Sequence, residues 1–452
     1  MATTKYSHAF LVGSFNGNVT PELLADDSLW EREEIKQSPT KEEKRYSDDK
    51  GYSGLCTIYY KAHLDAMIET QGVIRPASLS GTCHFVHNFG KSLATKVTLR
   101  KDQGKTPFQY TFYLQKLHLY FFPLGVVLFA IEIDDSNTDL NELTAAHYAL
   151  INFLDIDAFD SQELAKKLVP LTKYIPKSNS PKLNKDGNKL KIFQTVEIID
   201  PPNSEDSFNA VLYEIGTSAP IGSVLGGSCP SLKPSKAYFE SIIKENIVST
   251  FDNWKGLALM DSFTVLGSED SFKRDDWKFM YFPLVYLRCL YEKTYCFSRN
   301  NAYRLHDEEV GEELSKEIAF MEKYYFYDNI SYNFQPNLIY AAIAKGLEIK
   351  AERSDLIRQI KEKAKKEEEN KKDKEEKRFN NILAYVSIFA VFSVIWDAYS
   401  IAKEAFTIPL YYQSNVSSLF IASGVFIICM LIYQIYRKEI NLWVQKNILK
   451  KK

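Results

Sequence analysis

The chain has 452 residues, and its 56 basic and 58 acidic side chains leave a formal net charge of -2. This near-neutral balance excludes a dedicated nucleic-acid binder, because binding to a phosphate backbone needs a clear basic excess. Hydrophobic residues make up 45% and charged residues 25% of the chain, which excludes a largely disordered protein. The six cysteines form no CxxC pair, a pattern typical of a reducing compartment and not of a structural zinc site.

Residues 1–275 mix strand and helix patterns. Apolar residues at helical spacing predict helices around Leu140–Leu154 and Phe239–Ile247, and the polar residues 173–188 predict a surface loop. Because the helices fall between strand hairpins, we expect an α/β domain with a mixed sheet rather than a doubly wound parallel sheet. β-Branched and aromatic residues predict the strands, at residues 9–15, 108–122, 126–133, 192–199, 211–215 and 256–266.

The sequence contains none of the common catalytic motifs GxxxxGK[ST], GxGxxG after a strand, HExxH or GxSxG, so we predict that the protein is not an enzyme. His84 and His87 could in principle ligate a metal, but no further ligand follows at zinc-like spacing. His147 lies on an apolar helical stripe and is expected to be packed in the core.

One glycine-rich segment, residues 216–231, could expose its backbone amides to an anion. A nucleotide phosphate bound at Gly216, Gly222, Gly226 and Gly227 is one interpretation. A plain flexible loop is the other, since the glycine spacing matches no phosphate-binding signature.

Residues 276–380 are predicted to form a helical region and a stalk. The helical region runs from about Trp277 to Lys345, and residues 361–378 hold nine basic and seven acidic side chains. Pairs such as Glu362 with Lys366 favour a solvated helix over a disordered charged linker. We therefore predict one helix from about Leu338 to Ala402, on the order of 95 Å long.

Residues 381–438 are predicted to form a transmembrane hairpin. Residues 382–402 have Asp397 as their only charge, residues 416–436 have none, and each run of 21 residues can cross a bilayer. A buried hairpin in a soluble core fits poorly, because dense charge lies on both sides of the two runs. Lysine and arginine flank the pair, which predicts a multi-pass protein of the inner membrane with both termini cytoplasmic, including the basic tail at 439–452.

Two spans per chain cannot surround a water-filled path, so conduction would require a ring of identical chains. A seven-residue repeat on the first span places a partly polar stripe toward the axis of such a ring. In that position Val394 would form an apolar constriction and Asp397 a carboxylate ring that favours cations and is the one candidate metal site; the alternative is that Asp397 is merely solvated near the interface. The predicted pore-lining residues are Asn380, Leu383, Ser387, Ala390, Val394, Asp397 and Ile401.

This layout of an α/β domain, a long helix that becomes the first span, a short outer loop, a second span and a lysine-rich tail resembles the CorA family of divalent-cation channels. The resemblance implies a homopentamer, although four copies fit the stripe as well, with magnesium as a permeant or regulatory ion and no tightly bound cofactor. The family's Gly-Met-Asn motif is missing, since the region after the first span reads Ala402-Lys403-Glu404-Ala405-Phe406. The missing motif and the large cytoplasmic domain are more similar to the CorA-like membrane effectors associated with type III CRISPR systems.

The resemblance implies an antiviral effector channel opened by an adenylate-type signalling nucleotide, such as a conjugate of S-adenosylmethionine with AMP, that binds to a cytoplasmic sensor domain at 1–275. A constitutive CorA-like magnesium transporter is the first alternative, and a membrane-tethered binding protein is the second. The expected partners are further copies of the chain, the lipid bilayer and a small nucleotide, with no direct nucleic-acid contact.

Overall fold

The structure is a computed structural model, and the chain divides into two units, Met1–Ile360 and Lys361–Lys452. The residues that it describes are 3–15, 21, 24, 27–32, 82–99, 108–136, 138–151, 166–172, 190–227, 230–268, 274–305, 312–326, 328–330, 334–405, 418 and 422–426.

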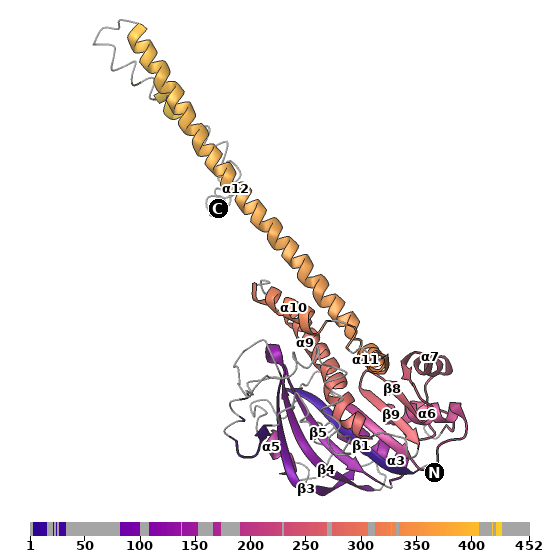
Figure 1. Cartoon of the computed structure of the whole chain (residues 1–452). Helices are drawn as coiled ribbons and strands as arrows, with labels where there is room; N and C mark the ends of the chain where they lie inside the picture. The colour runs from indigo at the N-terminus through magenta and orange to yellow at the C-terminus, as the bar shows by residue number, and fades with distance from the viewer. Residues whose placement is uncertain are drawn as a thin grey trace, which may run out of the picture. The chain divides into compact units, whose positions relative to one another are not determined.

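A mixed sheet forms the centre of the first unit (Figure 1). Its described strands follow the order β2-β3-β4-β5-β1-β6-β9-β8-β7, and every neighbouring pair is antiparallel except β6 and β9. The predicted α/β fold with a mixed sheet is therefore confirmed. The strands are β1 Thr4–Phe15, β2 Glu31–Arg32, β3 Cys83–Leu99, β4 Phe108–Phe121, β5 Val127–Asp135, β6 Lys191–Ile198, β7 Ile247–Val248, β8 Trp254–Ala258 and β9 Ser262–Ser268.

Both faces of the sheet are buried, because successive side chains of a strand point to opposite faces. Phe10 and Val12 of β1 belong to one core cluster, whereas Ala9 and Leu11 belong to the other. The second cluster contains α3 (Leu140–Ile151) and α6 (Glu205–Gly216), with α7 (Lys236–Asn246) packed beside it. The remaining short helices are α5 Val169–Thr172, α8 Arg274–Asp276, and the 3-10 turns η2 Pro123–Gly125 and η5 Pro230–Leu232.

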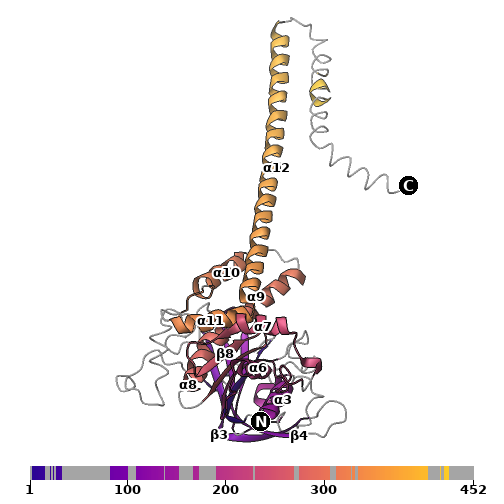
Figure 2. The same ribbon diagram turned by 90° about the vertical axis from the view of Figure 1, so that its right-hand side faces the viewer.

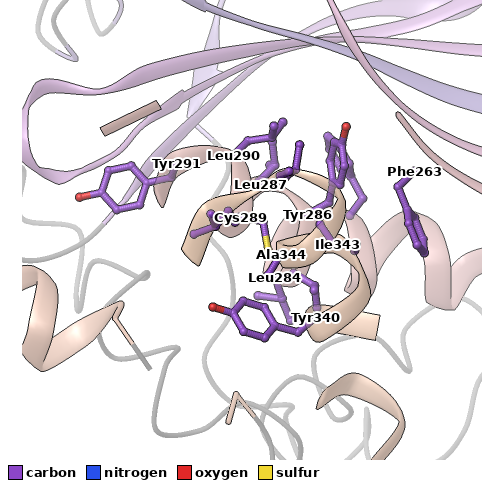
Figure 3. Packing of buried hydrophobic residues seen from close by; sticks show 14 of the residues in the cluster. Phe263, Leu284, Tyr286, Leu287, Cys289, Leu290, Tyr291, Tyr340, Ile343 and Ala344 are labelled. Atoms are coloured by element: carbon purple, nitrogen blue, oxygen red, sulfur yellow. The ribbon is translucent and has the colours of Figure 1, made fainter. Parts of the chain in front are cut away.

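The first cluster joins the sheet to a set of helices. In Figure 3, Ile343 and Ala344 of α11 belong to the same packed cluster as Leu284 of the π-helix η6 and Cys289 of α9. This packing fixes the C-terminal end of α11 against the core of the domain. The helices of this region are η6 Trp277–Tyr286, α9 Leu287–Leu305, α10 Glu312–Tyr324 and α11 Phe334–Gly346.

Two predicted strands need correction. Residues 211–215 lie inside α6, which Ser204 caps by accepting a hydrogen bond from the Ser207 amide at 3.2 Å. This cap and the acidic first turn outweigh the β-branched residues that suggested a strand. Residues 256–266 form not one strand but the hairpin β8–β9, because the chain reverses between Leu259 and Ser262.

The prediction of a single helix from Leu338 to Ala402 is also wrong, because the helix is interrupted after Gly346. A β-carbon at Gly346 would lie 2.8 Å from the carbonyl carbon of Ala258, so glycine permits this close packing. Glu348 then takes a left-handed conformation with φ of 56°. Helix α12 begins at Ile349 and continues to Ala405 for 57 residues, about 85 Å.

Helix α12 contains the apolar residues 382–402 of the first predicted span, and within the described part of the chain it is the one helix long and apolar enough to cross a membrane. The second predicted span, 416–436, is described only at Ser418 and Ala422–Phe426, so the hairpin stays a prediction. Gly424 is buried, and its β-carbon position lies 3.6 Å from two side-chain atoms of Ile395. The predicted loop at 173–188 lies outside the described residues.

Candidate functional site

A cavity of about 540 Å³ opens beside the junction between α11 and α12. Helices α6, α7 and α11 and strand β8 lie close together there in both ribbon views (Figures 1 and 2). The residues of its wall come from six separate parts of the first unit. The wall is formed by Tyr148, Ile151, Ile192, Tyr213, Gly216, Thr217, Ser218, Tyr238, Ile242, Asn246, Leu259, Met260, Asp261, Ser262, Lys345, Gly346 and Glu348.

Three tyrosines give this wall an aromatic character. Tyr148 comes from α3, Tyr213 from α6 and Tyr238 from α7. Tyr213 is nearly buried and makes an edge-to-face contact with Phe239, with ring centres 5.4 Å apart. Burial and the neighbouring Tyr238 raise the pKa of Tyr213, so its hydroxyl stays protonated. Tyrosine rings of this kind stack with planar ligands and leave a hydroxyl for hydrogen bonding.

The turn after α6 forms a firm edge of the cavity. Thr217 Oγ1 donates to the Tyr213 carbonyl at 2.8 Å, and Ser262 Oγ donates to the Gly216 carbonyl at 2.6 Å. Ser218 has a left-handed φ of 52°, which reverses the chain. Gly216, the first of the four glycines predicted to bind a ligand, therefore lies in the wall.

The other predicted glycines, Gly222, Gly226 and Gly227, are not part of this wall. The Gly222 amide donates to Glu214 Oε2 at 2.9 Å, and the Val224 amide donates to Glu214 Oε1 at 2.8 Å. The buried carboxylate of Glu214 thus accepts from backbone amides that could otherwise approach a phosphate.

The charged groups of the wall are mostly paired. Lys345 Nζ donates to Glu245 Oε2 at 2.9 Å, and this hydrogen bond lowers the pKa of Glu245. Asp261 pairs with Lys191. Glu348 is exposed, and the structure gives its carboxylate no ion pair with any described residue. The tyrosines, Lys345 and Glu348 were not predicted, because no local pattern connects segments that only the fold brings together.

The first turns of α12 are fixed to α9 by buried charges. Glu292 of α9 is fully buried between Arg288, at 3.2 Å, and Arg353 of α12, at 2.8 Å. Lys293 Nζ donates to Glu352 at 3.1 Å, and the Asn300 amide donates to the same carboxylate at 3.0 Å. The junction Lys345–Glu348 therefore lies between the cavity and an anchored helix.

All seven predicted pore-lining residues are exposed on α12 within this chain. Ser387 Oγ donates to the Leu383 carbonyl at 2.8 Å, which satisfies the hydroxyl inside its own helix. A neighbouring face is half-buried instead, and Gly424 packs on it at Ile395. The residues of that face are Ala384, Ile388, Val391, Ile395 and Tyr399.

His84 and His87 do not meet at one site. His84 Nε2 lies 3.0 Å from His118 Nδ1 inside the sheet, whereas His87 Nδ1 lies 2.6 Å from the Leu29 carbonyl. Residues three apart in a strand face opposite sides. Over the described ranges, no group of three His, Cys, Asp or Glu side chains could hold a metal ion. His147 is packed in the core as predicted, and burial lowers its pKa to about 4.

Comparison of the chain with models of protein families, with curated proteins and with solved structures finds no match. The cavity and helix α12 are therefore the features from which a function can be inferred.

Proposed function

We propose that this protein is an oligomeric membrane channel whose α/β domain binds a small ligand in the cavity and transmits binding through α12 to a pore. One observation carries the proposal. Glu348 lies in the cavity wall, and the next residue begins a helix that continues without a break through the exposed apolar segment 382–402. A ligand in the cavity thus acts on the helix that crosses the membrane.

The pore is formed by several copies, five or four, with the first span of each facing the axis. The exposure of the stripe supports this arrangement, because its residues are available to neighbouring copies. Val394 forms the constriction, and Asp397 forms a carboxylate ring that favours cations, magnesium among them. Gly424, which belongs to the predicted second span, lies on the adjacent face beside Ile395, and in this proposal the span 416–436 completes a hairpin with both termini in the cytoplasm.

The ligand is an adenylate-type signalling nucleotide, and the setting is antiviral defence linked to type III CRISPR systems. The layout of the sequence motivates this choice, and the tyrosines support it because a planar base stacks on aromatic rings. A cavity of about 540 Å³ is in the range for small-molecule sites. The ligand opens the pore only if it binds the open state more tightly than the closed state.

Cation flux from liposomes tests the proposal. Purified full-length protein is reconstituted at high density, and release of a trapped cation is measured with and without a conjugate of S-adenosylmethionine and AMP. We expect a ligand-dependent leak that Tyr213→Ala reduces. If cations leak without the ligand and added magnesium stops the leak, the constitutive transporter is favoured instead. Cellular activity that survives replacement of residues 382–402 by an unrelated apolar helix would favour the tethered binding protein.

A further inference from the structure

We infer that the cavity binds the planar base of the ligand against its tyrosines and a positively charged group of the ligand against Glu348, and that any phosphate of the ligand lies outside the cavity. The inference rests on the proposed function, since this ligand is the one that opens the pore. It goes further by assigning the two ends of the ligand to different parts of the wall.

The aromatic end follows from the exposed fractions of the tyrosines. Tyr148 and Tyr238 are each 54% exposed, although each lines the cavity. Ile242 of α7 and Ile151 of α3 add apolar surface beside them. A planar ring bound here would remove water from large aromatic and apolar surfaces, which favours binding.

The position of the ligand's positively charged group follows from the charged residues of the wall. Among the described residues of the wall, Lys345 is the one cation, and it already donates to Glu245 through two hydrogen bonds, at 2.9 and 3.2 Å. A phosphate would therefore meet carboxylates and paired donors, whereas a cation would meet the carboxylate of Glu348.

The position of Glu348 connects ligand charge to the helix. Its backbone is left-handed, with φ of 56°, and its amide donates to the Lys345 carbonyl at 3.0 Å. Its carbonyl accepts from the Glu352 amide at 3.4 Å, in the first turn of α12. A cation held by this side chain thus acts where α11 ends and α12 begins.

Three adenosine derivatives that differ in charge at the 5′ position test the inference. Full-length protein in detergent is titrated with 5′-amino-5′-deoxyadenosine, adenosine and AMP, and Kd is measured by calorimetry. We expect the amine to bind most tightly and AMP most weakly. Glu348→Gln should reduce the preference for the amine over adenosine by roughly fivefold, a modest factor because solvent screens an exposed carboxylate.

Asp355→Asn is the matched control, because it removes a carboxylate from the first turns of α12 outside the wall. It should leave the preference unchanged. Binding of AMP as tight as that of the amine, an unchanged preference in Glu348→Gln, or no binding of any of the three compounds would each overturn the inference. The expected preference without any ligand-dependent flux would contradict the proposed channel and leave the selectivity of the cavity intact.

Discussion

Burial and hydrogen bonds together shift the pKa of several side chains in the sheet. Glu132 is buried beside His8, His118 and Lys278. Burial alone would raise the pKa of Glu132, but hydrogen bonds with His118 and His8 outweigh it and hold the pKa well below its usual value. The carboxylate therefore stays ionised within the core. His84, at the end of the same chain of contacts, has its pKa lowered by burial and by His118.

His147 makes stability depend on pH. Burial lowers its pKa from 6.5 to about 4, so the folded state binds fewer protons than the unfolded state between these values. This contribution to stability is present above pH 6.5 and is lost as the pH falls toward 4. Between pH 6.5 and pH 4 the free energy of unfolding falls in both proteins, and we expect the fall to be about 3 kcal/mol smaller in His147→Met than in the natural chain.

Chemical denaturation at a series of pH values, followed by tryptophan fluorescence, measures this slope. Leu150→Met on the same helix provides the control, because it changes no titratable group, and it should keep the slope of the natural chain. An identical slope in His147→Met would show that the buried imidazole does not cause the effect.

At the scale of the element, the base of α12 depends on one ion network. Arg353 donates to buried Glu292 at 2.8 Å, and its guanidinium lies 4.8 Å from the centre of the Phe326 ring. Removing one partner of a buried pair is costly because the other charge stays buried. The helix is therefore anchored at its first turns, whereas its later turns are exposed.

We expect Arg353→Met to lower the free energy of unfolding by about 3 kcal/mol, because it leaves Glu292 with Arg288 as its only cation. Arg358→Met on the same helix is the control, since Arg358 pairs with Asp355 on an exposed face, where an ion pair contributes about 0.3–0.5 kcal/mol. Denaturant titration of both variants in detergent compares them. Equal losses would contradict the anchoring role of the network.

At the scale of the whole molecule, α12 presents two faces with different surroundings. Val394 is 67% exposed, whereas the next residue, Ile395, is half-buried against Gly424. One residue step rotates a side chain by about 100° around the helix. The face that meets Gly424 of the same chain is thus separate from the exposed face that the proposed ring would place at its axis.

Cysteine cross-linking tests this division in a background without native cysteines. Val394→Cys should form disulfide-linked dimers in membranes treated with an oxidant, because in the proposed ring the stripe of each copy faces the shared axis. Ile395→Cys should cross-link far less, since its own chain covers it. Equal cross-linking at both positions, or a protein that is monomeric in detergent, would contradict the ring.

Much of the fold could be predicted because the signals are local. Alternation of apolar and polar residues at 108–122 predicts strand β4, and the apolar stripe from Leu140 to Ile151 predicts helix α3; each pattern also predicts the buried face. The predictions were wrong where the secondary structure of a segment depends on residues outside that segment. Val211–Ile215 has strand-forming residues, but the cap at Ser204 places them in a helix. Gly346 ends α11 because the backbone of Ala258 lies against it.

The candidate site divides in the same way. That a long helix carries an apolar segment of membrane-spanning length could be predicted from consecutive residues alone, since length, charge spacing and hydropathy are local properties of the chain. The position of the cavity, in contrast, depends on the packing of the folded chain. Tyr148, Tyr213 and Glu348 are far apart in the chain, and a cavity exists only after the sheet and its helices have packed and brought them together.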